Sequence, residues 1–272
     1  MLLQDIVALL GFGVWGMEVF SESLFKGGFL LMSVGSGVWV FSQASPETRR
    51  SFLPTKTIDL EAVNAEAVEQ AAAKMRTPGA TKGKRAFDIL CSLIVIVFFA
   101  PLFLLTALAV KLDSSGPVFY RQERVGLDGK RFFIWKFRSM VRNAERDGPQ
   151  YAARGDHRVT RVGRLIRKTR IDEIPQIINV LRGEMSFVGP RPERPKFVSE
   201  FSEKIPHYSH RHLAMPGITG WAQVNHEYTA DAEGARQKLE YDLFFISNHS
   251  VLLEAWVLLK TIHVVLFGVG SR

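Results

Sequence analysis

The chain has a single cysteine among its 272 residues, and Cys91 lies inside an apolar run. A framework of disulfide bonds is therefore excluded, which is consistent with a reducing compartment. The N-terminus has neither a basic segment ahead of its first apolar stretch nor a small-residue cleavage site, so we expect no removable signal peptide. The chain also lacks a recognised nucleic-acid-binding motif, and we expect no nucleic-acid partner.

Negative charge is scarce in one part of the chain. From Lys111 to Arg170 there are 16 Lys or Arg against 6 Asp or Glu, whereas the whole chain has a formal net charge of only +8. The rest of the chain is therefore slightly acidic. A local excess of positive charge attracts phosphate or diphosphate groups. Although 47% of the residues are hydrophobic, this basic balance argues against a plain polytopic membrane protein.

Two adjacent carboxylates, Asp172 and Glu173, directly follow the basic region. The apolar periodicity over residues 172–181 predicts a helix, with Pro175 in the first turn, where proline is tolerated. The acids then lie at the helix N-terminus, which attracts anions. The pair suits a divalent cation, a phosphate substrate or both. The residue types alone are equally consistent with an ordinary acid pair that opens a helix.

The longest uncharged run, Ile89–Val110, has 22 residues, enough to cross a bilayer. Pro101 interrupts it, and basic residues flank both of its ends, at Lys82, Lys84 and Arg85 before it and Lys111 after it. The positive-inside rule would place both flanks on the cytoplasmic side. This favours a re-entrant helix-break-helix, with arms over 89–100 and 102–110, over a helix that spans the membrane.

Three further apolar stretches are shorter or less regular. Residues 6–17 are too few to span a bilayer, and 27–46 could form one crossing or a buried hairpin. Residues 251–267 predict either an interfacial helix or a core helix. Between these stretches, residues 58–76 are predicted to form a helix, with Thr57 as the candidate N-cap and Pro78-Gly79 ending it.

Two strands are predicted around the turn at Asp128-Gly129, over residues 117–126 and 130–140. Lys136 and Arg138 alternate with aromatic residues in the second strand and should share a face. This pattern indicates either a surface near a membrane or an edge that binds phosphate. Residues 141–148 should continue as a short helix.

These segments together resemble the bacterial sugar transferase family, also called monotopic phosphoglycosyl transferases. Seven motifs occur in the family's order, and the resemblance extends from Lys84 to the C-terminus. The motifs are Lys84–Asp88 ahead of an apolar run with a central Pro101, Gly116–Gln122, Lys136–Met140, Asp172–Val180, Ser186–Glu193, Pro216–Trp221, and Tyr241-Asp242 with Asn248 and Ser250. The tail Val264–Gly268 resembles the branch that is found with exopolysaccharide assembly.

The resemblance implies an enzyme that transfers a sugar 1-phosphate from a UDP-sugar to undecaprenyl phosphate and releases UMP. It implies Mg²⁺ as cofactor and a location at the cytoplasmic face of the bacterial inner membrane. The expected fold is α+β and mainly helical: a monotopic domain with a re-entrant helix, a short β-hairpin and amphipathic interfacial helices. We expect hydrophobic membrane segments over 1–50, a linker with a helix over 51–83, and a catalytic domain over 84–272 that includes the re-entrant helix 88–110.

The resemblance also implies roles for single residues. Asp172 would be the nucleophile that forms an aspartyl-phosphosugar intermediate, and Glu173 would bind Mg²⁺. The substrate phosphates would be bound by Arg191, by Lys136 and Arg138, and by Arg170, which alternatively only tunes the pKa of Asp172. Asp242 is a further candidate acid. The structural alternatives are a rigid turn at Arg191, a solvated strand at Lys136 and Arg138, and an ordinary buried acid at Asp242.

Two other functions remain open for the sequence. One is a non-catalytic, membrane-bound assembly factor for polysaccharide export, and the other is a metal-dependent lipid phosphatase. The first would be favoured by loss of Asp172 or Arg191, both of which are present, and the second needs a water-positioning base that we do not find. The sequence does not name the sugar, whose recognition we place in residues 147–156 or 226–235. Whether the chain forms a homodimer, and the topology of residues 1–50, also stay open.

Overall fold

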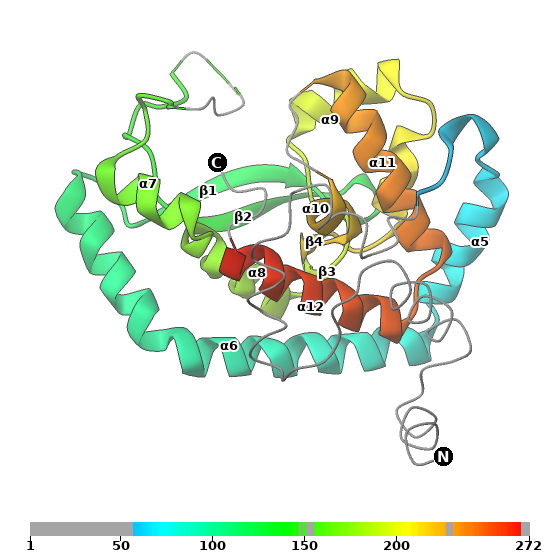
Figure 1. The fold of residues 1–272 in the computed structure, drawn as a ribbon, viewed down its shortest axis with the longest axis horizontal. Coiled ribbons are helices and arrows are strands. Elements are labelled where there is room, and N and C mark those ends of the chain that lie inside the picture. The colour runs from blue at the N-terminus through cyan, green and yellow to red at the C-terminus, as the bar shows by residue number, and fades with distance from the viewer. Residues whose placement is uncertain (1–56, 147, 149, 151–154, 227–230, 268–272) are drawn as a thin grey trace, which may run out of the picture. The chain divides into compact units, whose positions relative to one another are not determined.

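The computed structural model describes residues 57–146, 148, 150, 155–226 and 231–267. Helices dominate this part of the chain, with two small two-stranded sheets among them (Figure 1). The prediction of a mainly helical α+β fold with one long apolar helix is therefore confirmed. The membrane segments expected within 1–50 lie outside the described residues, and the proposed domain boundaries remain predictions.

The linker helix begins later than expected. A 3₁₀ turn over Leu60–Ala62 is followed by α5, Ala65–Met75, and the Asn64 side chain accepts a hydrogen bond from the Ala67 N–H of its first turn. Thr57 is therefore not the cap. Pro78 does not merely end this segment, because it is the first residue of the next helix, where a missing N–H costs nothing.

The long apolar helix α6 runs over Pro78–Asp113, and Pro101 lies inside it. The two separate arms that we expected, 89–100 and 102–110, are thus one continuous element, which changes direction along its length in Figure 1. Proline removes one backbone hydrogen bond and crowds the preceding turn, which bends a helix without necessarily ending it. Most of the apolar surface of α6 is not covered by the rest of the protein, as at Leu90, Val97, Phe98, Leu104 and Leu108.

The predicted hairpin is confirmed. Strand β1, Phe119–Val125, pairs antiparallel with β2, Arg131–Phe137, through the turn at Leu127–Gly129. The helix expected over 141–148 is wrong for residues 142–146, which form turns. The Arg158 guanidinium donates to the Ala144 carbonyl oxygen at 2.9 Å, and so occupies an acceptor that a continuing helix would use. Helix α7, Arg161–Lys168, follows.

The segment that carries the acid pair is not one α-helix. A 3₁₀ helix over Ile171–Gln176 leads into the short α8, Ile177–Arg182. Strand β3, Ser186–Val188, then pairs parallel with β4, Gly217–Thr219. The remaining elements are α9, Pro195–Lys204; a 3₁₀ helix over Tyr208–Leu213; α10, Trp221–Asn225; α11, Ala232–Ser247; and α12, Val251–Phe267.

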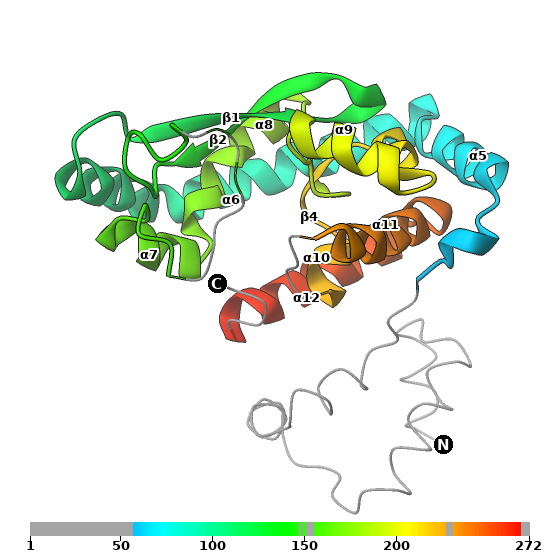
Figure 2. The same ribbon diagram turned by 90° about the horizontal axis from the view of Figure 1, so that it is seen from above.

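The main core forms around α11. Leu239, Leu243 and Ile246 of this helix are fully buried, and α5, α9, α10 and α12 contribute apolar side chains to the same cluster. Figure 2 shows α10, α11 and α12 together on one side of the molecule. Helix α12 combines both of the interpretations that the sequence left open: Val257 is buried in the core, whereas Val251, Leu252, Leu259 and Ile262 are exposed.

A smaller cluster connects the long apolar helix α6 to the hairpin. Val110 of α6, Phe137 of β2 and Ile166 of α7 are its buried members. The Phe103 ring of α6 lies 4.8 Å from the Phe137 ring, measured between centroids. The C-terminal end of α6 is therefore packed against the strand that carries Lys136.

Candidate active site

Asp172 and Glu173 line a cleft of about 390 Å³. The 3₁₀ helix places them there because Arg170, just before it, adopts a left-handed backbone conformation with φ of 57° and turns the chain out of α7. The hairpin, the segment after it, the turn around Arg191 and α10 form the other walls. The predicted residues Lys136, Arg138, Arg170 and Arg191 all line the same cleft, whereas Asp242 is not among its lining residues.

Glu173 is held between two cations. The Lys136 ammonium donates to Glu173 Oε1 at 2.8 Å, and the Arg191 guanidinium donates to both carboxylate oxygens, at 3.2 Å for Oε2. Burial opposes ionisation of Glu173, but the charges and hydrogen bonds of Arg191 and Lys136 outweigh it and hold the pKa of Glu173 well below its usual value. Glu173 is therefore a fixed negative charge that orients both cations in the cleft.

Asp172 has a different environment although it is the adjacent residue. Burial, and then the negative charge of Glu173, raise the pKa of Asp172 to about 6, against the opposing charges of Lys136, Arg167 and Arg191. Two neighbouring carboxylates with pKa values that are shifted in opposite directions are typical of sites in which each acid has its own chemical role. A carboxylate with a raised pKa that is still ionised near pH 7 is suited to act as a nucleophile.

The backbone of Arg191 is supported from behind by a residue that the sequence analysis missed. The Arg211 guanidinium donates to the Arg191 carbonyl oxygen at 3.0 Å, to Asp242 Oδ2 at 2.7 Å and to the Tyr208 hydroxyl at 2.7 Å. Asp242 is 1% exposed, so the structure places it beneath the Arg191 turn. Asp242 reaches the site through Arg211. The motif Tyr241-Asp242 in the sequence gave no sign that Asp242 pairs with this buried arginine.

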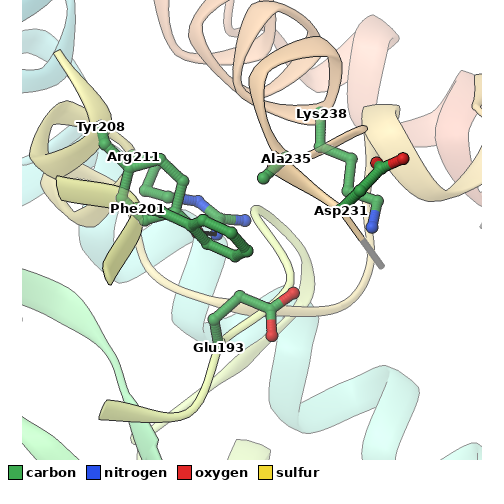
Figure 3. Close-up of a pocket in the computed structure, with 7 residues that line it drawn as sticks. All are labelled: Glu193, Phe201, Tyr208, Arg211, Asp231, Ala235 and Lys238. Atoms are coloured by element: carbon green, nitrogen blue, oxygen red, sulfur yellow. Dashed lines mark hydrogen bonds between the residues drawn. The ribbon is translucent and has the colours of Figure 1, made fainter. Parts of the chain in front are cut away.

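A second, very small cavity lies beside this support. It is lined by Glu193, Phe201, Tyr208, Arg211, Asp231, Ala235 and Lys238, which Figure 3 draws. Its volume is about 10 Å³, which is close to the space of one water molecule. It is therefore too small to be a substrate site.

Arg138 lines the cleft but is occupied elsewhere. Its guanidinium donates to the carbonyl oxygens of Ser114 at 2.6 Å, Val110 at 3.2 Å and Pro117. These bonds attach the end of α6 to the start of the hairpin. The phosphate-binding role that we predicted for Arg138 remains a prediction, and the contacts seen here are structural ones.

The opposite wall of the cleft is a polar network that the sequence analysis also missed. The Arg194 guanidinium donates to both oxygens of Glu145, at 2.8 and 2.9 Å, and the Gln122 amide donates to Glu145 Oε1 at 3.1 Å. Arg124 donates to Gln122 at 2.6 Å and to the Pro192 carbonyl oxygen at 2.8 Å. The sequence did contain one sign of this network. Side chains alternate along β1, which places Gln122 and Arg124 on the same face of the hairpin as Lys136 of β2.

The charges of the cleft suit an anionic substrate. Ten lining residues are Lys or Arg and four are Asp or Glu. No group of three His, Cys, Asp or Glu side chains that could hold a metal ion occurs among the described residues. The adjacent carboxylates of Asp172 and Glu173 fit the way Mg²⁺ is bound with phosphorylated substrates, where one or two carboxylates bind the ion and the phosphate oxygens and water supply the other ligands.

A carboxylate pair in a cationic cleft, attached to a long, exposed apolar helix, defines the class of enzyme that handles phosphorylated substrates at a membrane. The particular family follows from comparison with known proteins. The family model "Bacterial sugar transferase" matches residues 80–268, and the chain belongs to this family.

Several curated proteins are similar to the chain. A UDP-N-acetylgalactosamine-undecaprenyl-phosphate N-acetylgalactosaminephosphotransferase of Aeromonas hydrophila is 52% identical over 189 residues, which cover 70% of this chain and 45% of that protein. A UDP-glucose:undecaprenyl-phosphate glucose-1-phosphate transferase of Caulobacter vibrioides is 45% identical over 183 residues, covering 66% of this chain and 68% of that protein. The uncharacterized sugar transferase EpsL of Bacillus subtilis is 39% identical over 189 residues, covering 70% and 90%. The chain thus spans less than half of the Aeromonas relative.

Proposed function

We propose that this protein transfers a sugar 1-phosphate from a UDP-sugar to undecaprenyl phosphate and releases UMP. The observation that carries the proposal is the asymmetric acid pair: a buried Asp172 with a raised pKa beside a Glu173 that is neutralised by Lys136 and Arg191. The names of the Aeromonas and Caulobacter relatives support the same donor and acceptor.

In the first step, an oxygen of Asp172 attacks the phosphorus that carries the sugar. A new bond forms between this oxygen and phosphorus, and the bond from phosphorus to the leaving UMP oxygen breaks. Arg191 and Lys136, which pair with the neighbouring Glu173, would offset negative charge on the phosphoryl oxygens and on UMP. The covalent aspartyl-phosphosugar divides one difficult transfer into two easier ones.

In the second step, an oxygen of undecaprenyl phosphate attacks the same phosphorus and Asp172 leaves as a free carboxylate. The product is undecaprenyl diphosphate sugar. This order lets a soluble donor and a lipid acceptor use one cleft in turn, so the site does not have to hold both at once.

Mg²⁺ would be held by Glu173, as predicted, together with substrate phosphate oxygens. When bound, it would supply positive charge that stabilises the negative charge on the phosphoryl oxygens during attack on phosphorus. Glu173 already accepts hydrogen bonds from Lys136 and Arg191, so metal binding would have to share or displace these donors.

We place the protein at the bacterial inner membrane, with the cleft on the cytoplasmic side, and the exposed apolar surface of α6 supports the contact with a membrane. Only 11% of the most apolar 18-residue stretch of α6 is buried by the rest of the protein, so this surface is suited to contact lipid. The re-entrant path is part of the proposal. It rests on the basic residues at both ends of the uncharged run and on Pro101 inside it.

UMP release tests the function directly. Membranes that contain the protein are supplied with Mg²⁺, undecaprenyl phosphate and a panel of UDP-sugars that includes UDP-glucose and UDP-N-acetylgalactosamine. We expect UMP in excess of the enzyme to form from at least one donor, and only when the lipid phosphate is present. Release of inorganic phosphate from the lipid instead would support a phosphatase, and the absence of both reactions would support a non-catalytic assembly factor.

A further inference from the structure

One turn of α6 contacts both of the segments that carry the active site. Arg85 and Asp88 are three residues apart, and side chains with this spacing lie on the same face of a helix. Both are at the start of the helix, outside the uncharged run 89–110. Neither lines the cleft, so their contacts have no direct part in the chemistry described above.

Arg85 holds the segment that begins with the acid pair. Its guanidinium donates to the carbonyl oxygens of Val180 and Leu181 in α8. The last carbonyl groups of a helix have no partner within the helix, and a cation there also interacts favourably with the helix dipole. Because α8 directly continues the 3₁₀ helix that contains Asp172 and Glu173, Arg85 fixes the end of the same short unit.

Asp88 holds the segment that leads to Arg191. Asp88 is 4% exposed, and its Oδ1 accepts hydrogen bonds from the Ser186 hydroxyl at 3.1 Å and from the Phe187 N–H at 3.2 Å, both in β3. The same oxygen lies 3.1 Å from the Lys84 ammonium, which also pairs with Glu254 of α12 at 2.8 Å. The negative charge of Asp88 is thus compensated, as a buried carboxylate requires.

The chain between β3 and Arg191 has little freedom to absorb a shift. Gly189 packs so closely that a Cβ atom added there would lie 2.1 Å from the Met215 carbonyl oxygen. The Gly217 N–H donates to the Pro190 carbonyl oxygen at 2.9 Å, and prolines at 190 and 192 restrict the backbone on both sides of Arg191. A displacement of β3 on α6 would therefore reach the Arg191 guanidinium, and with it the ion pair with Glu173.

We propose that Arg85 and Asp88 are positioning residues, which hold the acid pair and Arg191 in register from a single turn of α6. The inference rests on the proposed function, because it concerns the geometry of that same site. It makes the alignment of Asp172, Glu173 and Arg191 depend on how α6 is seated.

The test uses the full-length protein in membranes and measures kcat and KM for UMP release. Asp88→Asn keeps an oxygen that can accept from Phe187 but loses the charge that pairs with Lys84, and Ser186→Ala removes one donor to Asp88. We expect Asp88→Asn to lower kcat roughly 10- to 100-fold with little change in KM for the donor, because a misplacement of about 1 Å has effects of this size. Ser186→Ala should have a smaller effect in the same direction. Lys82→Ala is the matched control, since Lys82 is an exposed basic residue of the same helix outside these contacts, and it should behave as wild type.

A double-mutant cycle separates positioning from a general loss of stability. Each change is repeated in an Arg191→Lys background, where the bidentate contact with Glu173 is already lost. We expect Asp88→Asn to cost much less there than in the wild type. An equal loss of kcat in both backgrounds would overturn the proposal, as would wild-type kcat in Asp88→Asn.

Two results keep this test distinct from that of the reaction itself. If the wild type releases no UMP with any donor, the proposed function is wrong, and this result is distinct from a failure of the positioning role of Arg85 and Asp88. If Asp88→Asn does not accumulate in membranes, the same double-mutant cycle is measured with Ser186→Ala and with Arg85→Lys. Losses of kcat that are additive with that of Arg191→Lys would then overturn the proposal.

Discussion

Arg211 and Asp242 form a buried ion pair, with Arg211 Nη2 lying 2.7 Å from Asp242 Oδ2, and the same nitrogen donates to the backbone carbonyl of Arg191. Both side chains are at most 5% exposed. Asp242 comes from α11 in the centre of the main core, whereas Arg191 contacts Glu173 in the cleft. The pair therefore connects the core of the protein to the arginine for which we propose phosphate binding.

Asp242→Ala should destabilise the protein strongly. The change leaves the Arg211 guanidinium buried without its counter-ion, and removing one partner of a buried pair costs about 3–5 kcal/mol. The measurement is the midpoint of thermal or denaturant unfolding in detergent. Glu200→Ala is the control, because its i,i+4 pair with Lys204 is exposed and should contribute less than about 1 kcal/mol. Similar unfolding midpoints for the two variants would show that the buried pair has no such role.

Asp172→Asn should abolish UMP release while membrane association is unchanged, because an amide cannot form the covalent phosphosugar. It should also unfold at a higher temperature than the wild type when both are measured in EDTA. Burial and the charge of Glu173 raise the pKa of Asp172 to about 6, so ionisation of this residue opposes folding. Removing the charge should add on the order of 1–3 kcal/mol near neutral pH. Substantial residual turnover in this variant would exclude Asp172 as the nucleophile.

The stability difference between Asp172→Asn and wild type should depend on pH in a defined direction. The folded-state pKa of about 6 is above the unfolded value near 3.8, so the wild type loses stability from Asp172 as pH rises through this window. The difference in unfolding temperature should be small at pH 4 and reach its full size by pH 7. A difference that is constant from pH 4 to pH 7 would contradict the raised pKa of Asp172.

The sequence was informative where a local pattern determines structure. The Asp128-Gly129 turn between two aromatic-rich segments predicted the hairpin, and the apolar run predicted α6, because both depend on short-range periodicity. The acid pair and the cations Lys136 and Arg191 could also be named, and the structure places both cations at hydrogen-bonding distance from Glu173. Their opposite pKa shifts could not be predicted, since these depend on burial by segments distant in the sequence.

What the sequence did not predict comes from tertiary contacts. Arg138 looked like a phosphate ligand in an alternating strand, but three backbone carbonyls at the end of α6 and the start of the hairpin hold its guanidinium. Arg211 was not singled out in the sequence, and only the approach of α11 reveals its contacts. Residues 142–146 form turns with i→i+3 backbone bonds instead of a helix, and Arg158, 14 residues from Ala144, donates to the Ala144 carbonyl oxygen.

Lys136→Met and Arg191→Lys should impair catalysis by different routes. Lys136→Met removes one of the two cations that hold Glu173, and we expect kcat to fall by roughly 10²- to 10³-fold, as for loss of one preorganised charge donor. Arg191→Lys keeps the charge but not the bidentate contact, so we expect a smaller loss. Steady-state UMP release measures both. Lys204→Met, at an exposed surface pair, is the control. A Lys136→Met variant as active as this control would show that Lys136 has no part in catalysis.

Pro101→Ala tests whether proline sets the path of α6 through the membrane. Alanine restores the backbone N–H and relieves the crowding that bends the helix, so α6 should straighten and favour a spanning orientation. The single native cysteine allows a clean assay: in a Cys91→Ser background, one cysteine is placed at Lys82 or at Asp113, and each is labelled with a membrane-impermeant reagent from one side. Both positions should label from the same side with Pro101 present and from opposite sides in Pro101→Ala. Same-side labelling in both proteins would mean that the charges at the two flanks, and not the proline, determine the re-entrant path.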